Sequence, residues 1–279
     1  NATPELLNGL YRERVGQANS REEYLEIITE MFATLNNGHA RLFEYRLSHL
    51  AKATLVENSL VLTGLAEESE LADKGAQIGW EITKIDGTLV GAWIKSQKKY
   101  FGGADQWVKR NTTYQVFMRF PFQPPKRSYT FKDLQGTEHT MTISLQNSFG
   151  DFMNAFYPEK KVISKEIETE GLPLGYISLH EMSTEAVAEF DSHLKQLLNT
   201  DGLILDLRNN SGGSSLAGDA IFRRLIQEPT PGWITAADNR PPHSPHDNPN
   251  YSNPIVVLIG YQTFSAAESF AFDIYDANR

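Results

Sequence analysis

The chain has 279 residues, of which 40% are hydrophobic and 22% are charged, and it contains no cysteine. This composition is typical of a globular protein, and the absence of cysteine excludes disulfides, thiolate metal sites and cysteine nucleophiles. The formal net charge of -9, without a dense cluster of Lys and Arg, argues against a nucleic-acid partner. The longest uninterrupted apolar stretch runs only from Ile255 to Ile259, so we expect no membrane span.

The N-terminal part of the chain has the apolar periodicity of helices. Ser20 followed by Glu23 has capping-box spacing and predicts the start of a helix. The residues Asn-Asn-Gly at 36–38 are typical of a helix end. His39 is therefore expected on a turn just past this helix, before a strand at 41–45.

The middle of the chain, from about residue 57 to 146, has short β segments separated by turns and predicts a small β-rich module. The alternating segments on both sides of "DLQGTE" predict a hairpin. From residue 174 onward, continuous apolar strands alternate with helical patterns, which predicts a parallel or mostly parallel sheet covered by helices. A long loop is expected at 227–253, which is rich in Pro, Asn and Asp.

Two strand ends in this last region carry candidate chemistry. "GLILDLRNNSGG" leads a strand into a glycine turn, where the amides of Gly212 and Gly213 can bind an oxyanion or phosphate, or form a plain strand-to-helix turn. "VVLIGYQTFSAAESF" repeats the geometry and places Ser265 at the same edge of the sheet. Ser265 and Glu268 have capping-box spacing, so Ser265 is either a helix cap or a nucleophile. The free N–H of Ala266 would assist a nucleophile there.

The other polar motifs predict no cofactor or metal. The glycine turn is neither a dinucleotide fingerprint nor a Walker loop. His243 and His246 lack further ligands in their Pro-rich segment, which favours a flexible rim over a metal site. Asp206 and Arg208 flank Leu207 and are expected to form a structural ion pair or hydrogen bonds at the strand end.

The segments "GYISL", "GLILDLRNNSGG" and "VVLIGYQTFSAAESF", in this order, resemble the core of the S41 family of serine peptidases. That family includes C-terminal processing peptidases and tricorn-type proteases. "MFATLNNGHARL" resembles the family's LNDGHTxL segment, with Asn37 in place of Asp and Ala40 in place of Thr. "GAQIGWEITKIDGTLV" resembles part of an inserted PDZ-like domain, with Trp80 where Asp is usual. The similar segments span most of the chain.

The resemblance implies a mixed α/β fold with a crotonase/ClpP-like core, an N-terminal helical segment and an inserted β-rich PDZ-like domain. The implied domains are a helical region and hairpin that join the catalytic core (1–57), the PDZ-like domain (58–148) and a C-terminally incomplete S41-type catalytic core (149–279). The family habit also implies a periplasmic or secreted protein. Because the chain begins without Met or a signal-peptide pattern, an export signal is expected to lie outside it.

The resemblance further implies a serine endopeptidase that acts on peptides or unfolded proteins through an acyl-enzyme at Ser265. The N–H of Ala266 and an amide of Gly212 or Gly213 would form the oxyanion hole. In the family's Ser/Lys dyad the lysine follows the serine by more than the 14 residues from Ser265 to Arg279, and no lysine lies in this stretch. The histidine of tricorn-type relatives corresponds to His39, which is therefore assigned as the general base.

Three alternatives stay open. A base beyond Arg279 would replace His39 in this assignment. The departures from the family pattern are compatible with a noncatalytic protein that binds peptides or apolar ligands. A crotonase-like acyl-transfer enzyme would also use a glycine-turn oxyanion hole, although nothing in the sequence indicates coenzyme A binding.

Overall fold

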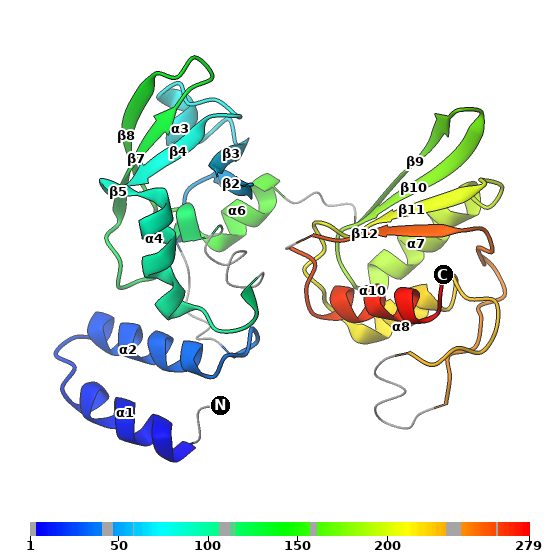
Figure 1. The fold of residues 1–279 in the computed structure, drawn as a ribbon, viewed down its shortest axis with the longest axis horizontal. Helices are drawn as coiled ribbons and strands as arrows, with labels where there is room; N and C mark the ends of the chain where they lie inside the picture. Colours follow the sequence, from blue (N-terminus) through cyan, green and yellow to red (C-terminus); the bar gives the residue numbers. More distant parts are fainter. Residues whose placement is uncertain are drawn as a thin grey trace. The chain divides into compact units, whose positions relative to one another are not determined.

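The structure is a computed structural model. It describes residues 4–40, 47–57, 59–105, 113, 115–156, 161–232, 241–260 and 262–279. The strand expected at 41–45 lies outside these residues. The chain forms two compact units, Asn1–Tyr157 and Pro158–Arg279, shown as ribbons in Figure 1. The limits of the implied domains at 57/58 and 148/149 remain predictions.

The first unit begins with two helices, α1 (Pro4–Gly16) and α2 (Arg21–Thr34). The helix start predicted at Ser20 is confirmed, and Ser20 is the N-cap residue of α2. Ser20 Oγ accepts the Glu23 N–H at 3.0 Å, and the Glu23 carboxylate accepts the Asn19 N–H at 2.8 Å. α2 also packs on a short 3-10 helix, η1 (Lys98–Tyr100).

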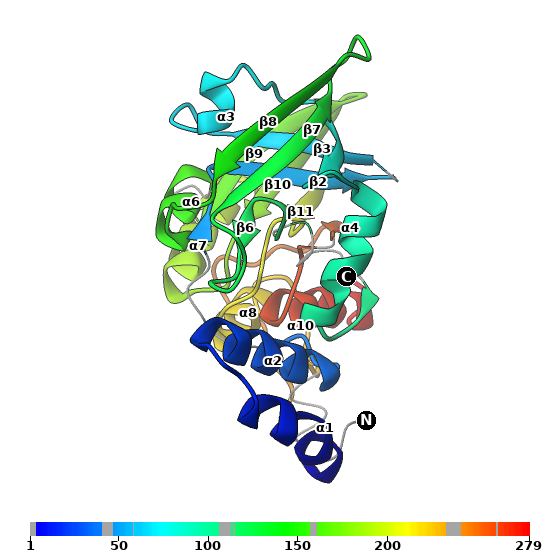
Figure 2. The same ribbon diagram turned by 90° about the vertical axis from the view of Figure 1, so that its left-hand side faces the viewer.

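An antiparallel sheet forms most of the first unit, in the order β2-β3-β4-β7-β8, with β5 paired to β4. The predicted hairpin is confirmed, since β7 and β8 lie side by side in Figure 2 and pair in continuous register. A separate short pair joins β1 to β6. The bounds of these strands and of the unit's remaining helices are β1 (Leu47–Ser48), β2 (Ala51–Val56), β3 (Ser59–Leu65), α3 (Glu70–Asp73), β4 (Glu81–Ile85), β5 (Thr88–Leu89), α4 (Val90–Gln97), β6 (Met118–Arg119), β7 (Lys126–Lys132), β8 (Glu138–Ser144) and α6 (Phe149–Phe156).

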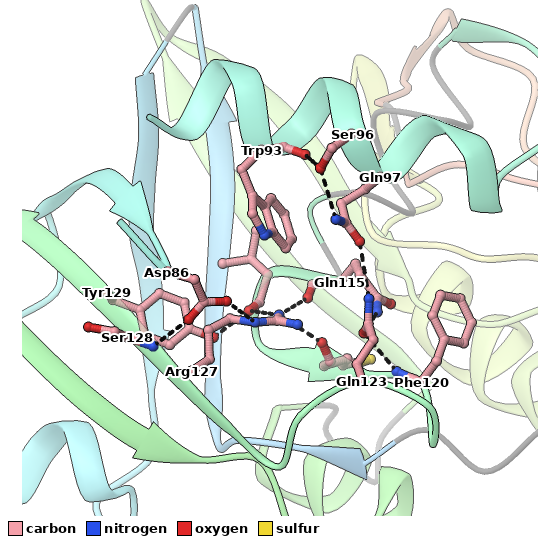
Figure 3. A network of polar contacts seen from close by, with 12 residues as sticks. Asp86, Trp93, Ser96, Gln97, Gln115, Phe120, Gln123, Arg127, Ser128 and Tyr129 are labelled. Carbon is pink, nitrogen blue, oxygen red and sulfur yellow. Dashed lines mark hydrogen bonds and ion pairs between the residues drawn. The ribbon is translucent and has the colours of Figure 1, made fainter. Parts of the chain in front are cut away.

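A buried arginine ties the segment before β7 to this sheet (Figure 3). Arg127 Nη1 donates to three main-chain carbonyls, those of Gln115, Val116 and Met118, at 2.8, 3.0 and 3.1 Å. The Arg127 guanidinium also lies over the Trp93 ring, 5.2 Å from its centroid. A buried cation is stable only when it is hydrogen-bonded, so these contacts fix the backbone around the arginine.

The second unit is a four-stranded sheet in the order β12-β11-β10-β9, in which β10, β11 and β12 are parallel and β9 is antiparallel to β10. In Figure 1 the three helices α7, α8 and α10 lie along one face of this sheet. The predicted mostly parallel sheet covered by helices is therefore confirmed. The bounds are β9 (Val162–Thr169), β10 (Leu172–Leu179), α7 (Thr184–Gln196), β11 (Gly202–Asp206), α8 (Ser215–Phe222), β12 (Ile255–Leu258) and α10 (Ala266–Asp276).

The core of the second unit fills the space between the sheet and its helices. Ile177, Leu203 and Leu205 point from alternate strand positions toward Phe190 and Phe270 on α7 and α10, and all are buried. Because β10, β11 and β12 are parallel, their carboxyl ends meet at one edge, where open α/β sheets build their sites.

Candidate active site

Ser265 is the N-cap residue of α10, as the capping-box spacing predicts. Its φ of 56° and ψ of -125° lie in a region that residues other than glycine rarely adopt, at a cost of about 1–3 kcal/mol. Two hydrogen bonds to Glu268 support this conformation. The Ser265 N–H donates to Glu268 Oε2 at 2.8 Å, and the Ser265 carbonyl accepts the Glu268 N–H at 2.9 Å.

The predicted glycine turn packs directly on Ser265. Gly212 has a φ of +94° and Gly213 a φ of +139°, which side chains disfavour. A Cβ on Gly212 would lie 2.5 Å from the Phe264 carbonyl oxygen and 2.8 Å from Ser265 Cβ. A Cβ on Gly213 would collide with the Met182 carbonyl oxygen. Both positions therefore require glycine, and Gly212 brings the turn next to the serine.

The two glycine amides have different partners. The Gly212 N–H donates to Asn210 Oδ1 at 2.8 Å. Within the described residues no acceptor takes the Gly213 N–H, and Gly213 is exposed. Ala266 is the first residue of α10, so its N–H has no carbonyl partner within the helix. The amides of Gly213 and Ala266 are thus available to bind a ligand oxygen, whereas that of Gly212 is engaged.

Two polar side chains that the sequence did not single out hold these loops together. Asn210 is fully buried and connects the ends of the three parallel strands through its side chain and main chain. Thr263 Oγ1 donates to the Leu207 carbonyl at 2.8 Å and accepts the Gly260 N–H at 3.0 Å. The only sequence signal for them is a short polar residue inside each strand-to-helix connection.

The predicted ion pair at the end of β11 is confirmed. Arg208 Nη2 lies 2.6 Å from Asp206 Oδ2, and the Tyr176 hydroxyl donates to the same oxygen at 2.8 Å. Burial raises the pKa of Asp206, but the hydrogen bonds from Arg208 and Tyr176 outweigh burial and hold this pKa below its usual value. Asp206 is therefore a structural anion, and it orients Arg208.

His39 lies on the turn that follows α2, as predicted, and is exposed. Its N–H donates to Asn37 Oδ1 at 2.9 Å, so the asparagine that replaces the family's aspartate shapes this turn. His39 belongs to the first compact unit and Ser265 to the second. Their pairing stays a prediction.

Among the described residues, no group of three or more His, Cys, Asp or Glu side chains is arranged to hold a metal ion. His243 Nε2 lies 3.8 Å from Asp219 Oδ1, and the His243 ring packs edge-on against Phe222. The main chain of His243 pairs with that of Thr230. No helix in the described part of the chain is both long and apolar enough to cross a membrane.

The fold is a mixed α/β architecture similar to that of CPAF. A crystal structure of a CPAF mutant matches with a TM-score of 0.77 at 14% identity, covering 100% of this chain and 79% of that chain. Mature CPAF matches with a TM-score of 0.72 at 13% identity, covering 98% and 76%. At these identities the likeness shows the fold, which confirms the predicted fold class. The PDZ-like character of the β-rich module stays a prediction.

The second unit is similar to a known protein family. The model of peptidase family S41 matches residues 173–279, a segment that contains the glycine turn and Ser265. The carboxyl-terminal-processing protease of Picosynechococcus sp. strain PCC 7002 is 36% identical over 124 residues, which are 42% of this chain and 29% of that protein. The Synechocystis sp. strain PCC 6803 protein of the same name is 35% identical over 112 residues, 39% of this chain and 26% of that protein. Residues 173–279 are thus similar to peptidase family S41, and the chain spans less than a third of the length of each of these relatives.

Proposed function

We propose that the protein is a serine endopeptidase in which Ser265 is the nucleophile and His39 is the general base. The observation that carries this proposal is the placement of Ser265 at a strained helix N-cap, packed against a glycine turn whose Gly213 amide has no acceptor among the residues that the structure describes. Strained residues of this kind cluster at active sites. The match to peptidase family S41 over residues 173–279 supports the same chemistry.

The proposed reaction has two halves. Ser265 Oγ attacks the peptide carbonyl carbon while His39 takes the hydroxyl proton, and the carbonyl oxygen becomes an oxyanion. The N–H groups of Gly213 and Ala266 stabilise that charge. The C–N bond then breaks, and the amine leaves with the proton from His39. Water, deprotonated by His39, attacks the ester, and the carboxylate product and Ser265 are released.

The substrate class follows from the same family assignment. We expect peptides or unfolded proteins, because an extended backbone can place its carbonyl between a serine and two amides. The antiparallel sheet of the first unit would hold such a peptide by strand addition if it acts as a PDZ-like module.

A fluorophosphonate probe tests the proposal on the full-length protein, because this probe phosphonylates only an activated serine. We expect labelling of the wild type, loss of labelling in Ser265→Ala, and a decrease of several orders of magnitude in His39→Ala. Ser252→Ala is the matched control, since Ser252 is an exposed serine of the same unit, and it should label like the wild type.

Two outcomes would redirect the assignment. An intact wild type that never labels and hydrolyses no peptide would favour the noncatalytic binding protein. Labelling that depends on Ser265 but persists unchanged in His39→Ala would assign the base elsewhere.

A further inference from the structure

Asn210 joins the three strand ends around the proposed site. Its Nδ2 donates to the Leu179 carbonyl, the last residue of β10, at 3.1 Å, and its Oδ1 accepts the Gly212 N–H at 2.8 Å. Its main-chain N–H donates to the Leu207 carbonyl at 3.0 Å, and its carbonyl accepts the Phe264 N–H at 3.1 Å. One buried residue therefore holds the glycine turn, the end of β10 and the residue before Ser265.

The connection from Leu179 continues to the glycine turn by a second route. The Met182 N–H donates to the Gly212 carbonyl at 3.0 Å, and the Met182 carbonyl accepts the Ser214 N–H at 2.7 Å. Gly213 thus lies between two residues that are hydrogen-bonded to Met182. Asn210 fixes the same turn from the other side by engaging the Gly212 N–H, and the Gly213 N–H is the amide that remains.

The neutral asparagine side chain satisfies both contacts at this position. The site needs one donor and one acceptor on a side chain of this length, and the side chain is fully buried. Aspartate has no donor when ionised, and serine is too short to bridge the carbonyl of Leu179 and the N–H of Gly212. A buried carbonyl or N–H left without a partner is destabilising, so a substitution would make the turn rearrange.

We propose that Asn210 is a positioning residue for the oxyanion hole, which sets the direction of the Gly213 N–H relative to Ser265. This inference rests on the proposed function. Asn210 does not contact the substrate in this assignment. It acts through the glycine turn and through Phe264, whose N–H it holds one residue before the nucleophile.

The pH dependence of the labelling rate of an Asn210→Asp variant tests this positioning role. The ionised carboxylate still accepts the Gly212 N–H but repels the Leu179 carbonyl, whereas the protonated acid regains a donor for that carbonyl. Burial raises the pKa of an aspartate, so the protonated form becomes populated at mildly acid pH. We expect the maximal fluorophosphonate labelling rate to be about tenfold to hundredfold lower than wild type at pH 8, with unchanged probe affinity. The ratio of the variant's labelling rate to that of the wild type should rise toward one as the pH is lowered.

Two further variants separate positioning from folding. Asn210→Ser is neutral and loses both contacts, so its labelling rate should be reduced by a factor that does not change with pH. Asn209→Asp adds the same charge on the exposed neighbouring residue and should match the wild type. All rates are measured per folded molecule, with the folded fraction taken from urea unfolding. A folded Asn210→Asp variant that labels like the wild type at pH 8 would overturn the proposal. The proposal would also fail if the labelling rate of Asn209→Asp, relative to wild type, changed with pH as much as that of Asn210→Asp.

Hydrogen exchange at the Gly212 and Gly213 amides keeps this test independent of activity. If Asn210 holds the turn, Asn210→Ser should exchange the Gly212 amide at least about tenfold faster, which matches a loss of about 1.4 kcal/mol of local stability. Unchanged exchange in a folded Asn210→Ser would overturn the positioning role even in an active protein. Faster exchange together with a wild type that never labels would support the role of Asn210 in the turn and refute the peptidase instead.

Discussion

Gly213→Ala is the sharpest test of the oxyanion assignment, because this position excludes a side chain for two separate reasons. The φ of +139° lies in a region that only glycine adopts readily. A Cβ there would also collide with the main-chain oxygen of Met182, which is itself held by the Ser214 N–H. The turn must therefore move, and the Gly213 amide must move with it.

The expected effects on stability and on rate differ in size. Backbone strain of this kind costs about 1–3 kcal/mol of the free energy of unfolding. Loss of one oxyanion donor lowers the rate by about 10²- to 10³-fold. A protein that is stable by about 5–15 kcal/mol stays almost fully folded after such a loss, so unfolding alone cannot lower the rate that far. A large decrease in rate in a folded variant would therefore come from the displaced amide.

Gly171→Ala is the matched control. Gly171 has a φ of +80° in the turn between β9 and β10, and no atom lies within 4 Å of the position of a Cβ. The substitution imposes backbone strain without a collision, at the edge of the sheet opposite Ser265. We expect Gly171→Ala to unfold at lower urea concentration and to label with fluorophosphonate at the wild-type rate. If folded Gly213→Ala also labels at that rate, the Gly213 amide is not an oxyanion donor.

Two further predictions concern the stability of each unit. Thr263→Val leaves the Leu207 carbonyl and the Gly260 N–H without their partner, so it should lower the free energy of unfolding, measured in urea, by about 1–3 kcal/mol. Thr263→Ser is the control, because it should keep both contacts. Equal stability of the two variants would contradict this prediction. Burial lowers the pKa of His49 from 6.5 to about 4, so the unfolded state binds more protons between these values and stability falls as the pH falls through this window. The full loss amounts to about 3 kcal/mol, at about 1.4 kcal/mol per pKa unit. Urea unfolding between pH 7 and pH 4 should show this slope, and a His49→Gln variant that keeps the whole slope would refute its origin in His49.

The parts of the fold that the sequence predicted correctly depend on local signals. Ser20 and Glu23 are three residues apart, so the Ser20 cap of α2 can be identified without tertiary information. The β7–β8 hairpin depends on alternation around a glycine turn, and the parallel sheet depends on continuous apolar strands between helices. Each of these features is set by residues that are close in the chain.

The parts that the sequence left open depend on contacts between distant segments. The difference between Gly212 and Gly213 arises from the Asn210 side chain. The orientation of that side chain depends on Leu179 at the end of another strand. Likewise, two adjacent asparagines precede the turn, and only the packed structure buries Asn210 and exposes Asn209. The pairing of His39 with Ser265 has the same long-range character and awaits the labelling experiment.

The capping role of Ser265 and its proposed catalytic role are compatible, because the main chain of Ser265 carries cap contacts of its own. The main chain of Ser265 makes the two hydrogen bonds to Glu268, through its N–H at 2.8 Å and its carbonyl at 2.9 Å. These contacts help to offset the strain of a positive φ, and the helix that they begin supplies the Ala266 amide and the positive end of its dipole. The S-x-x-E spacing is therefore a requirement of the proposed site, because the same cap that starts α10 also fixes the nucleophile beside its oxyanion donors. It follows that Glu268→Ala should impair labelling through the conformation of Ser265, although Glu268 has no part in the chemistry.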